Sequence, residues 1–463
     1  MPSRLLCVAT AVVLLAVAAG YIAMLHAEND WTGISATPFS QVGSINRPLP
    51  EQAQPAPGPE YRNNLRIAHI AYGHADDWPQ FRGPDGQGHA SAKNLPVVWT
   101  EHDNVAWKTS IPGLGWSSPV ISGDRVWLTT ADNSRPPLRV IGIERATGVI
   151  ACNLGVLLPE AAIKVHPRNS HATPTPVIDN DRLYAHFGPY GTACVTVAGK
   201  IVWTAEEDYT TEYGPSSSPI IWRNLLILSC EGSDLQYIVA RDKFTGKEVW
   251  KQQHPGRNSE STPLLVSQPG GGMLICNLAG RLTALDPTTG RERWSLETGI
   301  GYAQVARPVF GNGRIFACGG YFDPFVMAVQ PSMGSAKAHE LWKTRGASAP
   351  YIVSPLLVGE ELYLIGPHGL LSCLNASTGR EHYRERLGAE VSASPVFADG
   401  RIYVVDEEGT TTVVQPGRVF RKLAVNRLHE RVQASPAIAG NEIFLRTDRA
   451  LYCIVNLSRE RAL

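Results

Sequence analysis

The sequence predicts an all-β fold, an eight-bladed β-propeller with four-stranded blades, from three observations. A triplet of Ser, Thr or Arg, then proline, then an apolar residue recurs eight times along the chain. Its prolines follow one another at intervals of 57, 43, 44, 45, 47, 40 and 41 residues, which is about the length of one propeller blade. A motif ending in tryptophan closes several of these units, and an unpaired strand of the same type precedes the first unit.

Each unit has the same internal order. The triplets are Ser118-Pro119-Val120, Thr175-Pro176-Val177, Ser218-Pro219-Ile220, Thr262-Pro263-Leu264, Arg307-Pro308-Val309, Ser354-Pro355-Leu356, Ser394-Pro395-Val396 and Ser435-Pro436-Ala437. After each triplet come a short turn, an alternating strand such as Ile402 to Val405, a glycine turn and a third strand. Alternation with a period of two places one face of each strand against a neighbouring blade.

The fourth strand carries the most specific motif, which is complete at Ala284 to Trp294 and at Ala240 to Trp250. In this motif an Asp side chain bonds backbone donors of the turn, and Gly takes a positive φ that branched residues resist. The tryptophan is expected to pack as a flat plate between neighbouring blades. We expect this docking role at Trp107, Trp203, Trp250, Trp294 and Trp342.

The ring is predicted to close through its two ends. The segment from Val105 to Lys108 reads as a fourth strand that stands before the first proline strand, and the last unit, from Pro436 to about Ile454, has three strands. Pairing the strand of Trp107 with that unit completes an eighth blade and removes exposed edges. A seven-bladed ring is the alternative, because the first unit is long and irregular.

The Ala-x-Asp-x-x-Thr-Gly-x-x-x-Trp motif resembles the tryptophan-docking motif of the pyrroloquinoline-quinone-like (PQQ-like) repeat family over roughly residues 99–455. That family includes quinoprotein alcohol dehydrogenases and BamB-type outer-membrane assembly lipoproteins. The segment Asp77 to Pro84 also resembles an opening motif of exported bacterial proteins that carry this propeller. The resemblance implies a propeller and a function in the cell envelope.

The N-terminus indicates export. Arg4 precedes an uncharged run from Leu5 to Leu25, which is both like a signal peptide and long enough to span a bilayer. Residues 1–27 are therefore read as a signal peptide or a membrane anchor, and the two alternatives stay open. Residues 28–74 are proline-rich and predict a linker, and residues 75–458 form the PQQ-like repeat propeller. We expect the chain to be exported, and either periplasmic or anchored to the membrane facing the periplasm.

Composition narrows the classes of partner and site. Lys plus Arg equals Asp plus Glu at 42 each, which argues against nucleic acid as a partner. Cys194, Cys373 and Cys453 fall at one equivalent position of three repeats, so they are read as buried apolar residues rather than disulfide partners. His166 and His171 lie five apart in a loop that contains Pro167, which favours ordinary loop histidines over a metal pair.

The loops that enter the proline strands converge on the central channel, where propellers usually bind. At these loops the sequence places aromatic and polar side chains that either line a ligand or partner site or cap the channel. They are Trp116, His171, Tyr213, Glu260, Tyr302, Gln304, Arg307, Tyr351, Glu390 and Gln433. No catalytic residue and no metal ligand is assigned.

Two functions remain. In the first, the chain is a non-catalytic scaffold in the cell envelope that binds envelope proteins or a small ligand, needs no cofactor and is a monomer. It would touch the membrane only through residues 5–25 if that run is not cleaved. In the alternative, it is a PQQ-dependent alcohol or sugar dehydrogenase, which would hold PQQ with calcium. Calcium needs six to eight oxygen ligands, and the loops offer only Glu260 and Glu390 as acids. This class also often has a disulfide between adjacent cysteines, a pair that the sequence lacks.

Overall fold

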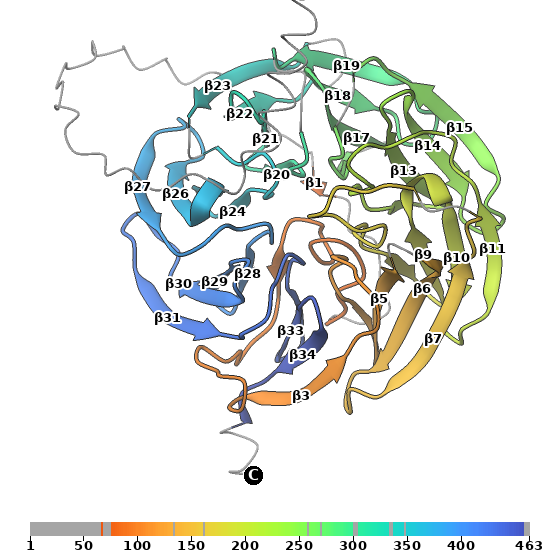
Figure 1. The fold of residues 1–463 in the computed structure, drawn as a ribbon. Helices are drawn as coiled ribbons and strands as arrows, with labels where there is room; N and C mark the ends of the chain where they lie inside the picture. Colours follow the sequence, from red (N-terminus) through yellow and green to blue (C-terminus); the bar gives the residue numbers. More distant parts are fainter. Residues whose placement is uncertain are drawn as a thin grey trace, which may run out of the picture. The chain divides into compact units, whose positions relative to one another are not determined.

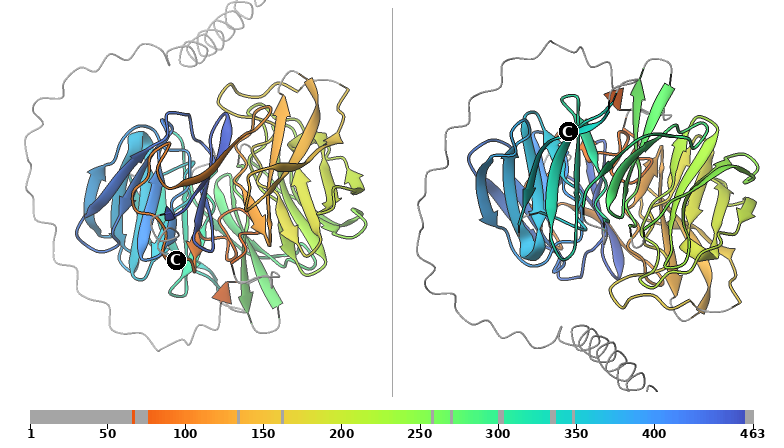
Figure 2. Two further views of the ribbon diagram at one scale, coloured as in Figure 1. Left: turned by 90° about the horizontal axis from the view of Figure 1, so that it is seen from below. Right: turned by 90° about the horizontal axis from the view of Figure 1, so that it is seen from above.

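The computed structural model describes residues 66–67 and 76–457, except 133–134, 161–162, 257–258, 269–270, 300–303, 333–336 and 347–348. The chain divides into two units at Arg62, and the described residues all belong to the second. In this unit eight sheets, each with four antiparallel strands, follow one another around a ring (Figure 1). Figure 2 shows the ring from two sides. The prediction of an eight-bladed propeller is confirmed.

Blades 1 to 4 follow the repeats in order. Blade 1 has β4 (Val120–Ser122), β5 (Arg125–Asp132), β6 (Arg135–Glu144) and β7 (Ile150–Leu157). Blade 2 has β8 (Val177–Asp179), β9 (Arg182–His186), β10 (Thr192–Thr196) and β11 (Ile201–Ala205). Blade 3 has β12 (Ile220–Trp222), β13 (Leu225–Glu231), β14 (Gln236–Asp242) and β15 (Glu248–Gln253). Blade 4 has β16 (Leu264–Gln268), β17 (Gly271–Leu278), β18 (Arg281–Leu285) and β19 (Glu292–Glu297).

Blades 5 to 8 complete the ring. Blade 5 has β20 (Val309–Gly311), β21 (Arg314–Gly319), β22 (Phe325–Gln330) and β23 (His339–Arg345). Blade 6 has β24 (Leu356–Val358), β25 (Glu361–Gly366), β26 (Leu370–Asn375) and β27 (Glu381–Arg386). Blade 7 has β28 (Val396–Ala398), β29 (Arg401–Val405), β30 (Thr410–Val414) and β31 (Lys422–Arg427). Blade 8 has β32 (Ala437–Ala439), β33 (Glu442–Arg446), β34 (Ala450–Ile454) and β3 (Val105–Ser110).

The ring closes as predicted, because β3 pairs antiparallel with β34 and brings Trp107 opposite Cys453. Two further short strands join inner strands. β1 (Arg66–Ile67) pairs with β16, and β2 (His89–Ala90) pairs in parallel with β28. Within the described part of the chain, two short 3-10 helices, Gly188–Tyr190 and Pro367–Gly369, lie in loops between strands. Among the described residues, no helix is both long and apolar enough to cross a membrane.

The docking tryptophans lie between blades. The indole N–H of Trp203 in blade 2 donates to the carbonyl of Lys243 in blade 3 at 3.1 Å, and its ring lies against Gly246. Trp107, Trp250 and Trp342 repeat this arrangement with Arg145, Pro287 and Ala376 as acceptors. Trp294 packs between blades 4 and 5 in an apolar cluster with Phe310 and Ile315. In blade 1 the equivalent position holds Cys152, which faces Gly199 of blade 2.

A belt of hydrogen bonds around the axis explains the Ser or Thr of the repeat triplet. In six places the hydroxyl oxygen of one triplet accepts the backbone N–H of the matching residue in the preceding blade, at 2.8 to 3.1 Å. The acceptors are Thr175, Ser218, Thr262, Ser354, Ser394 and Ser435. These N–H groups are buried, so each needs a partner. Arg307 has no hydroxyl and cannot serve as an acceptor in this belt.

The belt predicts that Ser218→Ala lowers the free energy of unfolding by about 1–3 kcal/mol, because it leaves the buried N–H of Thr175 without its acceptor. Ser218→Thr is the control and is expected to keep most of the stability, since Thr175 and Thr262 hold the equivalent position in neighbouring blades. Urea unfolding followed by circular dichroism measures both variants. Equal stability of the two variants would contradict the role given to the hydroxyl.

The cysteines in the described part of the chain are free, and all of them except Cys152 are buried. Cys194 and Cys373 lie opposite Trp203 and Tyr383 in their sheets, which is the position that Cys453 occupies opposite Trp107. They therefore fill space beneath the docking side chains.

Candidate functional site

The chain itself runs through the centre of the ring in a segment that we call the plug (Asp77–Ala90; orange at the centre of Figure 1). The plug begins at blades 1 and 2. Trp78 exchanges two backbone hydrogen bonds with Ile121 on β4, at 2.9 and 2.8 Å. The carbonyl of Pro79 then accepts the N–H of Ile178 on β8 at 2.8 Å.

The far end of the plug contacts blades 5, 6 and 7. The side-chain oxygen of Gln87 accepts the backbone N–H of Phe310 on β20. His89 makes a hydrogen bond to the carbonyl of Leu357 at 2.8 Å and pairs with Phe397 on β28. Since these blades lie across the ring from blades 1 and 2, the plug crosses the axis.

Two buried arginines hold the plug. The guanidinium of Arg82 donates to the carbonyls of Gln87 at 2.6 Å and Pro355 at 2.8 Å, and that of Arg307 donates to the carbonyl of Phe81 at 2.9 Å. Burial, and then the nearby charge of Arg307, lower the pKa of Arg82 to about 9. At Gly86 an added Cβ would lie 2.6 Å from the Arg307 guanidinium. Arg307, predicted to line the channel, is therefore a buried contact of the plug.

One face of the ring carries the loops that enter the inner strands, and we call it the mouth face. On this face Arg168, from the loop between β7 and β8, reaches across to blade 7. Its Nη2 lies 2.5 Å from Oε1 of Glu407 and 2.9 Å from Oε2 of Glu390. The predicted residue Glu390 is thus paired with a partner from blade 2's entering loop.

Glu407 is the centre of this network. It also accepts hydrogen bonds from Ser392 at 2.5 Å and Gln433 at 3.3 Å, and it lies 3.2 Å from Arg431. Burial by itself raises the pKa of Glu407, but the bond from Ser392 and the charge of Arg168 outweigh it and hold the pKa below its ordinary value. The carboxylate therefore stays ionised. We call Arg168, Glu390, Glu407, Arg431 and Gln433 the mouth cluster.

Aromatic side chains flank the mouth cluster. The guanidinium of Arg431 lies 5.6 Å from the ring of Trp116, in the range of a cation–π contact. The ring of Tyr351 contacts that of Tyr321 edge-on at 5.1 Å, and Tyr321 contacts Phe322 at 5.0 Å. Phe322 is 80% exposed. Exposed aromatic and arginine side chains of this kind are enriched at protein interfaces.

The other predicted residues do not join the mouth cluster. His171 is buried against Tyr190, with ring centroids 4.7 Å apart, and burial lowers its pKa. Tyr213 lies against His166, and Gln304 is fully buried beneath Gly319. Tyr302 lies outside the described residues.

Glu260 lies on the mouth face at the entrance to blade 4. Burial raises the pKa of its carboxyl to about 8, against the effect of the hydrogen bond with Ser216, and the charge of Glu231 raises it further. Glu231 itself is paired with His254 at 3.0 Å.

This shift predicts a pH dependence of stability. The folded carboxyl of Glu260 keeps its proton up to about pH 8, whereas the unfolded one releases it near 4.5, so its contribution to stability falls as pH rises between these values. Glu260→Gln stays neutral, and we expect its stability relative to wild type to grow over that window. Thermal unfolding at stepped pH tests this, with Glu212→Gln on an exposed residue of the same face as the control. A pH-independent difference would contradict the shift.

Five residues of the mouth cluster and its aromatic flank were not predicted: Arg168, Glu407, Arg431, Tyr321 and Phe322. Arg168 lies within the histidine loop that drew attention for its possible metal pair, and Glu407 lies in an ordinary acidic turn. They are far apart in sequence, and no local pattern marks them as partners.

The residues present do not fit a calcium-bound quinone. Glu407 and Glu390 already accept Arg168, and Glu260 favours its neutral form, so these acids do not offer the several free oxygen ligands that calcium requires. Within the described residues, no three His, Cys, Asp or Glu side chains gather as a metal site would need.

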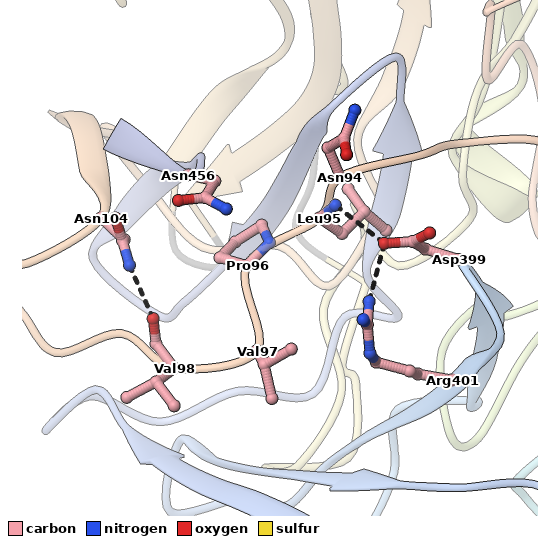
Figure 3. Close-up of a pocket in the computed structure, with 9 residues that line it drawn as sticks. All are labelled: Asn94, Leu95, Pro96, Val97, Val98, Asn104, Asp399, Arg401 and Asn456. Atoms are coloured by element: carbon pink, nitrogen blue, oxygen red, sulfur yellow. Dashed lines mark hydrogen bonds and ion pairs between the residues drawn. The ribbon is translucent and has the colours of Figure 1, made fainter. Parts of the chain in front are cut away.

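A separate hollow of about 400 Å³ lies where residues 94–104 pass along blades 7 and 8 (Figure 3). Asp399 accepts the N–H of Leu95 at 3.1 Å and pairs with Arg401 at 2.7 Å. Asn104 donates to the carbonyl of Val98 at 2.8 Å. The bond between Leu95 and Asp399 fastens the segment before β3 to blade 7.

Comparison with known proteins agrees with the repeats. A family model described as outer membrane protein assembly factor BamB matches residues 170–365 and 325–459. The outer membrane protein assembly factor BamB of Legionella pneumophila (strain Paris) is 24% identical over 205 residues, which cover 42% of this chain and 50% of that protein. The chain thus spans half the length of this curated relative.

Two solved structures share the fold. BamB from Moraxella catarrhalis superposes with a TM-score of 0.58 at 15% identity, covering 75% of this chain and 96% of that one. A europium-containing methanol dehydrogenase superposes with a TM-score of 0.63 at 11% identity, covering 82% and 98%. At these identities the likeness concerns the fold alone.

Proposed function

Because the chain belongs to the PQQ-like repeat family whose model is described as outer membrane protein assembly factor BamB, we propose that it is an exported scaffold that binds other envelope proteins through its mouth face and catalyses no reaction. The apolar run from Leu5 to Leu25 supports export. The name of the relative supports a location in the envelope.

One observation carries the proposal: Phe322 stays 80% exposed beside Tyr321 and Tyr351 on the mouth face. Two others agree with it, since the plug crosses the axis and the charges of the mouth cluster are paired with one another. The plug occupies part of the axis, where a substrate of a propeller enzyme would be expected to bind. Exposed aromatic side chains next to paired charges are typical of protein interfaces, where a few aromatic anchors supply much of the binding energy.

Crosslinking in intact cells followed by affinity recovery of the full chain tests the proposal. We expect an envelope protein to be recovered with wild type and to be depleted in Phe322→Ser. The matched control is Val419→Ser, because Val419 is 82% exposed in the turn between β30 and β31, away from the mouth face. Recovery of no envelope protein above background, or equal recovery with both variants, would refute the assignment. Dye-linked alcohol oxidation by the purified chain with added quinone and calcium would refute it as well.

A further inference from the structure

Among the outer strands of the ring, only β7 of blade 1 and β11 of blade 2 contain no charged residue. They differ in the residues beside them, since β7 is flanked by Val149 and Leu158 and β11 by Lys200 and Glu206. Each blade ends in an outer strand with a free edge, and natural proteins guard such edges with charged side chains and bulges. Blades 3 to 7 carry a charged residue two positions before the docking residue. These are Glu248, Glu292, Glu340, Glu381 and Lys422.

Blades 8, 1 and 2 carry Val105, Ile150 and Ile201 at this guard position. Val105 and Ile150 are half-buried against the core, whereas Ile201 is 38% exposed. β11 keeps the bulge that the other outer strands have, so the charge is the protection that it lacks.

The surroundings of Ile201 are also apolar. Val202 and Val197 are each 39% exposed, and β11 contains no charged residue from end to end. Charges appear only at its flanks, with Lys200 directly before the strand and Glu206 directly after it, both exposed. β11 is therefore an uncharged edge with a basic start and an acidic end.

We propose that β11 is an interface between two copies of this chain, which pair antiparallel through their β11 edges about a two-fold axis near Trp203. Antiparallel pairing of identical strands sets the start of one against the end of the other, so Lys200 of each copy meets Glu206 of the second copy. Two such contacts form, because a two-fold interface repeats every contact. The backbone groups of the two edges pair, and the exposed valines and isoleucines are covered.

The charges that flank β11 indicate which partner pairs with its edge. A strand from an unrelated protein would need the same order, basic then apolar then acidic, to match this edge, and the chain itself supplies that order. This inference replaces the monomer expected from the sequence. It does not depend on the proposed partner at the mouth face, since that face involves Phe322 and not β11.

The test measures the mass of the purified full chain in detergent by sedimentation over a range of concentrations. Wild type is expected to reach twice the mass of the single chain. Ile201→Glu places on β11 the residue that blades 3 to 6 carry at the guard position, so it should fold normally and stay monomeric. An unchanged circular dichroism spectrum confirms the fold of this variant, since its melting temperature is expected to fall with the loss of dimerisation.

Charge reversal makes the test specific. Lys200→Glu or Glu206→Lys alone sets like charges opposite each other twice and is expected to weaken dimerisation roughly tenfold. Mixing the two variants restores both opposite-charge contacts and should restore the dimer. Arg291→Glu, the residue equivalent to Lys200 in blade 4, is the control and should dimerise like wild type. A wild type that stays monomeric, an Ile201→Glu variant that still dimerises, or a mixture that does not recover would each overturn the proposal.

Discussion

Trp203→Ala is expected to lower the free energy of unfolding by about 3–5 kcal/mol, which is the usual cost of removing a buried tryptophan. Trp203 is only 9% exposed and covers the turn of the next blade, where an added Cβ on Gly246 would lie 2.7 Å from the ring. Alanine leaves a cavity between blades 2 and 3. It also leaves the carbonyl of Lys243 without the indole N–H that reaches it at 3.1 Å.

Denaturant unfolding of the full chain measures this loss, and Trp203→Phe separates its two causes. Phenylalanine keeps much of the apolar contact but has no N–H, so its stability should fall between those of wild type and Trp203→Ala. In a closed ring each blade contacts two neighbours, so we expect one lowered transition rather than the loss of a single blade. An unchanged midpoint of unfolding for Trp203→Ala would mean that the ring of Trp203 does not stabilise the contact between blades 2 and 3.

The fold was predictable because its signals are local and repeated. The glycine at a positive φ in each turn, the docking tryptophan and the Ser/Thr-Pro triplet each mark one position of a blade, so their spacing counts the blades. Closure was predictable because one strand was left over at the start and one was missing at the end. The reason for the Ser or Thr became visible only in three dimensions, where Thr175 of blade 2 meets the N–H of Ser118 in blade 1.

The site was predictable only in part. Position in the repeat indicated which loops reach the mouth face, and Glu390, Gln433, Trp116 and Tyr351 lie at or beside the mouth cluster. The partner of Glu390 could not be inferred, because the contact with Arg168 depends on how the ring closes rather than on any local pattern.

The role of the plug could not be predicted from the sequence either. The motif from Asp77 to Pro84 stood out in the sequence through a resemblance, with no physical reason attached to its residues. In the structure Gly83 and Gly86 leave room for Trp78 and for Arg307, a residue that belongs to blade 5. A segment that packs against five separate blades has no periodicity of its own, so its role could not be derived from spacing.

Trp78→Ala is expected to release the plug, because it removes about 3–5 kcal/mol from the free energy that holds the plug in place. Trp78 is fully buried, exchanges two backbone bonds with Ile121 and lies 2.7 Å from the position of an added Cβ on Gly83. The propeller has its own belt of hydrogen bonds and its own docking tryptophans. The loss should therefore appear first as local opening of the plug and only at higher denaturant as unfolding of the ring.

Hydrogen exchange distinguishes these two outcomes. In wild type the amides of Gly83 and Gly88 donate to the carbonyls of Gln80 and Arg82 inside the plug, so they should exchange slowly. In Trp78→Ala they should exchange much faster, while the amide of Ser218 in the belt stays protected. Equal acceleration at both places would mean that the plug is part of one cooperative unit with the ring. Faster exchange in the plug alone would mean that the plug can open while the ring stays folded. Partner binding by this variant would then show whether opening of the plug changes the mouth face.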